Sequence, residues 1–482
     1  MNRTVSLLSL AAGLGLLALV LASPSSSQKP PPQDPQVVVA PPVTPVVAPV
    51  VVPVPPPVAK PGSLTVVGKL SHPVVGVGRT DAFVTVDLQG VEVPGQQRAP
   101  VNLAVVIDRS CSMAGEPLAQ AKRAAQHLVR QLGPEDRLAI VHYGSDVRTL
   151  GGLMATEENR ARMERYLRAI SDDGGTNISD GLAAGKAQVL RAAGDFKVNR
   201  VILISDGQPT EGMTEDRQLL ALAGRIRRDG VTISSIGVGT EFNERVMQGI
   251  AEYGTGGYAY LRNASMLASV FQKDLQQAGT TVARDVELSF ELPEDVELEE
   301  VLGYRHTREG RTVRVPLTDF SAGQQERVIA KVRVAASEVG RTVDVARVKV
   351  TYRDLLAERP AESLQTLAAL TTERKEEVAQ HRDRDVALYA ARAQAAQNTT
   401  RAADLFAQGR RKEAKQALEQ NAYVYEEAAA VAGPAAVAAD VAEQRELSAG
   451  FESARGDDEV QHQVKGAKAK ALKDFGRMGS TY

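Results

Sequence analysis

The segment 103–113 constrains the fold of this chain more than any other. Residues 103–107 form an unbroken apolar run, and the polar residues Asp108, Ser110 and Ser112 follow it at alternate positions. Such a run is typical of a buried parallel strand, because parallel sheets are covered on both faces. Open α/β sheets place their sites in the loops that follow such strands. The segment therefore predicts a polar site at the carboxyl edge of a parallel sheet.

The polar residues after this strand are suited to a hard cation. One carboxylate and two hydroxyls favour Mg²⁺ or Mn²⁺ over zinc or copper, but they cannot complete an octahedron alone. Two later segments offer further oxygen atoms. A Gly-Gly-Thr-Asn turn at 174–177 precedes an expected helix, and a second apolar strand, 201–204, runs into Ser-Asp-Gly at 205–207. We therefore expect three loops to converge on one divalent cation.

These three motifs, in this order and on these elements, resemble the von Willebrand factor type A (VWA) domain. The resemblance implies a metal-ion-dependent adhesion site. An alternative is that the same Ser, Thr and Asp residues only cap helices, but capping does not explain why three separate loops converge. The implied metal ligands are Asp108, Ser110, Ser112, Thr176 and Asp206, and the implied rim of the site consists of Gly175, Asn177, Gly207 and Gln208.

The types of residue in this set favour binding over chemistry. Hydroxyl ligands are neutral, so the two carboxylates hold the ion without fully neutralising its charge, and the ion attracts an acidic group from outside. The resemblance implies that this group is an Asp or Glu side chain of a partner protein. It also suggests the hypothesis that ligand binding shifts the last helix of the domain, expected at 265–278.

Residues 101–279 alternate between strand and helix patterns with short links, which predicts a doubly wound parallel sheet in the α/β class. The order and length of these elements match the VWA family. After the first strand, we expect strands at 137–143, 147–150, 201–205, 231–238 and 258–261, and helices at 116–132, 156–170, 179–193, 214–228, 243–253 and 265–278.

The segments on either side of this unit show strand texture. Alternating apolar residues mark 63–100 and return in 280–360, and the alternation slips between Val345 and Val348, which predicts a β-bulge. Each segment is short for a β-sandwich by itself. We therefore expect the two to pair into one sandwich into which the VWA domain is inserted, an arrangement that resembles integrin β chains.

The N-terminal 62 residues predict export. Residues 1–22 contain Arg3 and an apolar run from 5 to 22, which is typical of a signal peptide, although an uncleaved membrane anchor is an alternative. Residues 23–62 are rich in Pro, Val and Ala, which favours an extended linker, either a spacer or a leader without a selected length. We expect an extracytoplasmic protein that is secreted, periplasmic or in the cell envelope.

The C-terminal part changes composition again. Ala, Glu, Gln, Lys and Arg dominate from 361, with breaks at Gly409 and Gly433-Pro434, so residues 361–454 are predicted to form a helical bundle. Residues 455–482 carry spaced lysines and are predicted to be a flexible basic tail.

Composition and motifs narrow the function further. The net charge of −2 does not indicate nucleic-acid binding, which usually requires an excess of positive charge. The chain has no phosphate-binding Gly-Lys-Ser/Thr loop and no His-Glu-x-x-His motif, and it shows no general base or nucleophile beside the predicted metal, so we expect no enzyme. The alternatives are a structural envelope protein whose metal only stabilises the fold and, more remotely, a metal-dependent hydrolase.

One position departs from the VWA pattern. Cys111, the only cysteine, stands between the two serines, where the family often has glycine. We expect a small buried filler there, and the alternative is a thiol that oxidises and distorts the ligand loop.

Overall fold

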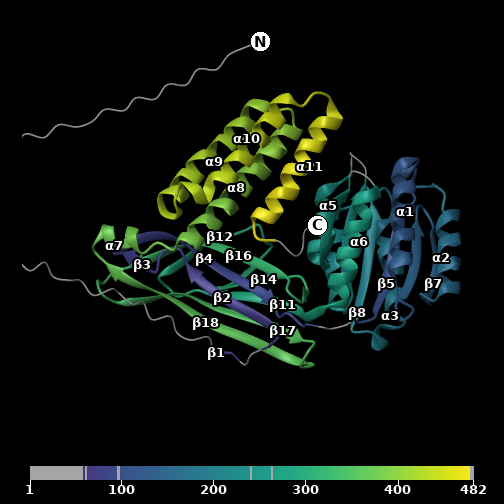
Figure 1. Ribbon diagram of the computed structural model, residues 1–482, viewed down its shortest axis with the longest axis horizontal. Helices are drawn as coiled ribbons and strands as arrows, with labels where there is room; N and C mark the ends of the chain where they lie inside the picture. The colour runs from purple at the N-terminus through teal and green to yellow at the C-terminus, as the bar shows by residue number, and fades with distance from the viewer. Residues whose placement is uncertain (1–57, 60–61, 95–97, 239–241, 262–263, 478–482) are drawn as a thin grey trace, which may run out of the picture. The chain divides into compact units, whose positions relative to one another are not determined.

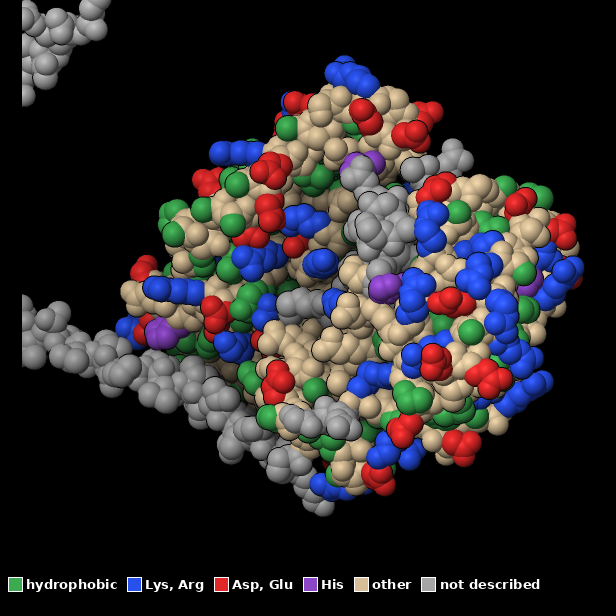
Figure 2. Space-filling model, turned by 45° about the vertical axis from the view of Figure 1, so that its right-hand side comes forward, with side chains coloured by type: hydrophobic (Ala, Val, Ile, Leu, Met, Phe, Trp, Pro, Cys, Tyr) green, Lys and Arg blue, Asp and Glu red, His purple; other side chains and the backbone are tan. Residues whose placement is uncertain are grey.

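The computed structural model describes residues 58–59, 62–94, 98–238, 242–261 and 264–477 (Figure 1). The predicted signal segment 1–22 and nearly all of the predicted linker 23–62 lie outside the described residues. Within the described residues, every helix is too short or too polar to span a lipid bilayer. Charged side chains of both signs cover the face shown in Figure 2, as expected from 57 basic and 59 acidic residues.

A six-stranded sheet forms the centre of the α/β part, with the strand order β10-β9-β8-β5-β6-β7. All neighbours are parallel except β6 and β7. Every residue of β5, β6, β8 and β9 is buried, and for β5 and β8 the apolar runs predict this. The strands are β5 (Val101–Asp108), β6 (Arg137–Tyr143), β7 (Val147–Met154), β8 (Val198–Ser205), β9 (Thr232–Val238) and β10 (Thr255–Leu261).

Helices cover both faces of this sheet, which confirms the doubly wound fold. One apolar core joins the sheet to α1, α2 and α6, and a second core on the opposite face joins it to α3, α4 and α5. The helices are α1 (Glu116–Gln131), α2 (Glu157–Ala169), α3 (Ile178–Leu190), α4 (Asp216–Arg228), α5 (Glu244–Tyr253) and α6 (Ala264–Gly279), with short 3₁₀ turns η1 (Cys111–Met113) and η2 (Ala193–Asp195).

The flanking segments pair with one another across the insertion, as predicted. Strand β4 (Gly78–Gly90), which precedes the α/β part, pairs along its length with β16 (Gln325–Ala336), which follows it. The sheet β12-β16-β4-β2 shares one apolar core with the larger sheet β1-β18-β17-β11-β14-β13. The other strands are β1 (Val58–Ala59), β2 (Leu64–Leu70), β3 (Val74–Gly76), β11 (Thr281–Glu291), β12 (Val296–Leu302), β13 (Thr307–Glu309), β14 (Thr312–Pro316), β15 (Phe320–Ser321), β17 (Thr342–Asp354) and β18 (Arg359–Thr372).

Strands β17 and β18 confirm one prediction and contradict another. The register between them shifts at Asp344 and Ala346, which confirms the predicted bulge. The prediction that helical structure begins at 361 is wrong, because β18 continues to Thr372. The inward-facing residues of β18 include Ser363 and Gln365. Because these two are polar, the sequence does not show the alternation of apolar and polar residues that is typical of a strand. The Gln365 amide is satisfied by the backbone of Gly68, so a polar side chain is accommodated in the core.

The C-terminal region is helical between Lys375 and Asp474. Helices α8, α9, α10 and α11 lie side by side (Figure 1). The predicted flexible tail is wrong for α11, because Val464, Ala467 and Leu472 on this helix are buried. An apolar stripe thus runs between its lysines. The helices are α7 (Lys375–Gln380), α8 (Arg384–Ala407), α9 (Arg411–Ala432), α10 (Pro434–Ser453) and α11 (Asp457–Asp474).

Candidate metal centre

Asp108 is the last residue of β5, and its carboxylate is fully buried. One carboxylate oxygen accepts a hydrogen bond from the Ser110 backbone amide at 2.9 Å. The other accepts bonds from the Ser205 hydroxyl at 2.6 Å and the Tyr143 hydroxyl at 3.2 Å. The hydroxyls of Ser110 and Ser112 lie 3.0 Å apart, so both predicted serine ligands point to the same place.

Tyr143 and Ser205 hold the Asp108 carboxylate, and neither was among the predicted site residues. Both end strands adjacent to β5, and the parallel register of β5 and β6 pairs Asp108 directly with Tyr143. Ser205 immediately precedes Asp206, at the end of β8. Alignment of the strand ends of the predicted sheet was the signal that could have revealed them.

Asp206 follows β8 and is 7% exposed. Its carboxylate accepts a bond from the Gln208 amide at 3.2 Å, and its backbone carbonyl accepts one from the Asn243 amide at 2.7 Å. Gly207 has φ of 68°, and a Cβ there would approach the Met247 side chain to 2.8 Å. The turn that directs the Asp206 side chain thus requires glycine at 207.

Backbone hydrogen bonds join the three loops. The Thr176 carbonyl accepts from the amides of Thr210 and Glu211, and the Thr176 amide donates to the Thr210 hydroxyl at 2.8 Å. The Cys111 amide donates to the Gly174 carbonyl at 3.1 Å. The Thr176 loop therefore lies between the Asp108 loop and the Asp206 loop, at one edge of the sheet.

The four residues of the predicted rim differ in exposure. Gln208 is exposed and Gly175 is half-buried, so both are accessible at the site. Asn177 and Gly207 are buried. The Asn177 side chain caps α3 by accepting from the Asp180 amide. Cys111 is exposed, so the expectation that it is a buried filler is wrong.

Two acidic side chains, Asp108 and Asp206, lie close enough at this edge for the charge of one to act on the other. Burial, and then the charge of Asp206, raises the pKa of Asp108 to about 6, against the opposing effect of its hydrogen bonds. The neighbouring Arg109 pairs instead with Asp146 and Asp173. Among the residues that the structure describes, no Lys or Arg forms an ion pair with Asp108 or Asp206.

These donors fit a hard divalent cation. In the described part of the chain there is no group of three or more His, Cys, Asp or Glu suited to a metal. The site has only two carboxylates, and its other oxygen donors are hydroxyls. Such a set suits Mg²⁺ or Mn²⁺ rather than zinc or copper. A bound cation would offset the repulsion between Asp108 and Asp206.

Comparison with known proteins identifies the α/β part of the chain. Residues 102–274 match the family model of the von Willebrand factor type A domain. The chain contains a VWA domain. A solved VWA protein from Catenulispora acidiphila has the same fold, with a TM-score of 0.64 and 18% identity, over 84% of this chain and 96% of that chain.

Curated relatives each match less than half of the chain. The protein YfbK of Escherichia coli is 28% identical over 211 residues, which cover 43% of this chain and 36% of YfbK. Inter-alpha-trypsin inhibitor heavy chain H1 of Sus scrofa is 29% identical over 198 residues, 39% of this chain and 22% of that protein. The chain thus spans well under half of either relative. VWA domains often mediate protein–protein interaction and metal-dependent binding and are generally non-catalytic.

Proposed function

We propose that this protein binds a protein partner through a divalent cation, Mg²⁺ or Mn²⁺, at the carboxyl edge of its VWA sheet. Asp108, Ser110, Ser112, Thr176 and Asp206 hold the cation. An Asp or Glu side chain of the partner completes the coordination.

The observation that carries the proposal is the pairing of Asp108 and Asp206. Two carboxylates that are 0% and 7% exposed lie in one another's field, and hydroxyl and amide groups surround them. Burying like charges together is unfavourable unless a cation joins them. Ser112 and Gln208 next to them are exposed, so a ligand from solvent can reach the site. No general base or nucleophile accompanies the carboxylates among the predicted site residues, which favours binding over hydrolysis.

We further propose that the protein acts outside the cytoplasm, either released or held by its N-terminal segment. The apolar stretch 5–22 and the proline-rich residues after it support this proposal. Fractionation of cells that produce the full chain tests it, and recovery of the intact chain in the cytoplasm would contradict it.

Affinity capture tests the binding function. The full chain is incubated with envelope extract in Mg²⁺ or in EDTA, with D108A as the matched control. The proposal predicts a partner that is retained by the wild-type protein in Mg²⁺ and lost both in EDTA and with D108A.

The structural alternative makes a different prediction for the same proteins. If the metal only stabilises the fold, D206A lowers the melting temperature in Mg²⁺ but leaves every captured protein unchanged. Direct binding of a purified captured partner, with its Asp and Glu residues replaced one at a time, then identifies the acidic ligand. Full affinity after every such replacement would contradict the proposed coordination.

A further inference from the structure

Helix α11 contacts the VWA domain at the amino end of α5. The ammonium group of Lys468 lies 3.3 Å from the carboxylate of Glu244, the first residue of α5, and 2.7 Å from Asp404 on α8. Lys465 is 3% exposed, and its ammonium lies 4.0 Å from the centre of the Phe242 ring. Leu472 joins the apolar core beneath α5.

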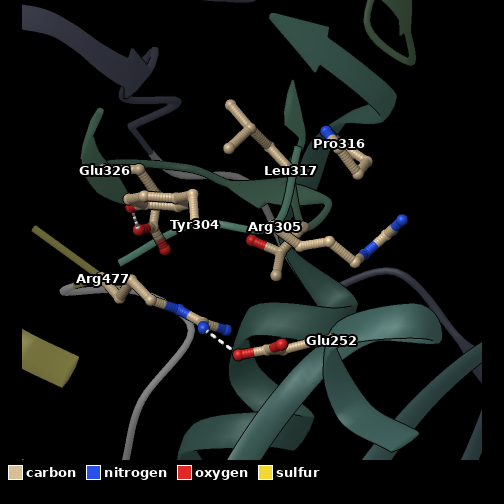
Figure 3. Close-up of a pocket in the computed structure, with 8 residues that line it drawn as sticks. Glu252, Tyr304, Arg305, Pro316, Leu317, Glu326 and Arg477 are labelled. Atoms are coloured by element: carbon tan, nitrogen blue, oxygen red, sulfur yellow. Dashed lines mark hydrogen bonds and ion pairs between the residues drawn. The ribbon is translucent and has the colours of Figure 1, made fainter. Parts of the chain in front are cut away.

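The segment after α11 contacts the other end of α5. Arg477 is 5% exposed, forms an ion pair with Glu252 and lies 5.7 Å from the ring of Tyr304 on the sandwich side (Figure 3). The Gly476 carbonyl accepts a bond from the Arg327 amide of β16. Charged contacts from the C-terminal region therefore hold both ends of α5.

The amino end of α5 also holds the metal-site loop. Asn243 caps α5 by accepting from the Val246 amide, and its own amide donates to the Asp206 carbonyl at 2.7 Å. Asn243, which makes this bond, directly precedes Glu244, the partner of Lys468. A short covalent and hydrogen-bonded path thus joins α11 to a predicted metal ligand.

We propose that α11 is a positioning element of the metal centre. By fixing Glu244, it holds Asn243 and the Asp206 loop in the arrangement that binds the cation. The proposal rests on the proposed metal site and adds to it a coupling with the C-terminal helices. Because coupling between binding events is reciprocal, metal binding strengthens the docking of α11, and loosening α11 weakens metal binding.

Two lysines on α11 provide a matched test. Lys468 pairs with Glu244 of the VWA domain, whereas Lys470 pairs with Glu443 and Asp474 of the C-terminal helices. Mg²⁺ affinity of the full chain is measured by titration calorimetry for K468M and K470M. We expect K468M to weaken binding at least about fivefold and K470M to change it less than about twofold.

The sign of the K468M effect separates positioning from long-range charge. Removing a positive charge near a cation site strengthens cation binding if the effect is only Coulombic. Unchanged or tighter binding by K468M would therefore overturn the proposal. If the wild-type chain binds no Mg²⁺, the proposed function fails instead, so the two failures are distinguishable.

A second pair of variants removes the two carboxylates that pair with Lys468. E244Q removes the VWA carboxylate and D404N removes the one on α8. We expect E244Q to weaken Mg²⁺ binding more than D404N does, and equal effects would count against the proposal.

Hydrogen exchange gives a readout independent of affinity. Amides of α11 should exchange more slowly in Mg²⁺ than in EDTA in the wild-type chain, and equally in both with D206A. Equal exchange of wild-type α11 in Mg²⁺ and EDTA would contradict the coupling.

Discussion

At the amino edge of the VWA sheet each buried carboxylate contacts an arginine, whereas at the carboxyl edge Asp108 and Asp206 contact hydroxyl and amide groups. At the amino edge, the Arg200 guanidinium lies 2.6 Å from the Asp274 carboxylate, and that of Arg227 lies 2.9 Å from Asp319. Asp136 pairs with Arg98. The amino edge is therefore neutralised by the protein's own side chains.

The pKa values at the two edges differ in direction. Burial alone would raise the pKa of Asp319, but the charges of Arg227, Arg284 and Arg200 lower it below its ordinary value. Burial and Asp206 raise the pKa of Asp108. The buried acids at the amino edge are thus neutralised by arginines, whereas those at the carboxyl edge are left for the proposed cation.

The largest expected effect is at the amino edge. R200M leaves Asp274 buried without its arginine, and removing one partner of a buried pair costs about 3–5 kcal/mol. Urea unfolding should show this loss equally in Mg²⁺ and EDTA. The control is R123M, because the pair of Arg123 with Glu116 is exposed and should contribute at most about 1 kcal/mol. If R200M lowered the free energy of unfolding only in Mg²⁺, the amino edge would not differ from the carboxyl edge in its dependence on metal.

The next effect belongs to the carboxyl edge. Mg²⁺ at about 100 times its Kd should stabilise the wild-type chain by about 2.7 kcal/mol, because it binds only the folded state. D206A should abolish this stabilisation, whereas R200M should retain it. Thermal unfolding across a Mg²⁺ series measures both, and equal stabilisation of D206A and the wild type would contradict the assignment.

The pH dependence of D108N tests whether the charge of Asp108 destabilises the carboxyl edge. In EDTA at pH 7 the ionised, buried Asp108 destabilises the folded state, so D108N should be more stable than wild type by about 1–3 kcal/mol. The folded pKa of about 6 lies above the ordinary value of 3.8. As the pH falls through this window the wild-type carboxylate takes up a proton in the folded state, and the advantage of D108N should disappear by about pH 4. A constant advantage would show that charge is not its cause.

The smallest expected effect on stability is that of S112A. Ser112 is exposed, so its loss should change stability in EDTA by less than about 0.5 kcal/mol. It should still weaken Mg²⁺ binding by about tenfold, since one oxygen ligand is lost. Calorimetry and urea unfolding of the same sample separate the two effects, and unchanged affinity would exclude Ser112 from the site.

A region of this protein could be predicted from the sequence where the residues that determine its structure are close together in the chain. Strand β5 and the Asp108 loop were predictable because an apolar run and the polar residues after it are adjacent in the chain. The Tyr143 and Ser205 hydroxyls depend on register between strands, which no single segment encodes.

The C-terminal errors have the same origin. Gln365 faces the core because Gly68, almost 300 residues earlier, satisfies its amide. Lys465 is buried because its ammonium forms cation–π contacts with the aromatic rings of Phe242 and Tyr260 in the VWA domain. Composition alone suggested a helix around Gln365 and a solvated tail around Lys465. Both predictions were wrong because the residues that contact these two side chains lie far away in the sequence.

We propose that Asp108 and Asp206 share one divalent cation at the carboxyl edge. Titration of the full chain with Mn²⁺, followed by the paramagnetic resonance signal of the free ion, tests it most directly. We predict one bound Mn²⁺ per wild-type chain, released by excess Mg²⁺, and none with D108A or D206A. Failure of the folded wild-type chain to bind Mn²⁺, or binding that persists in both variants, would contradict the account.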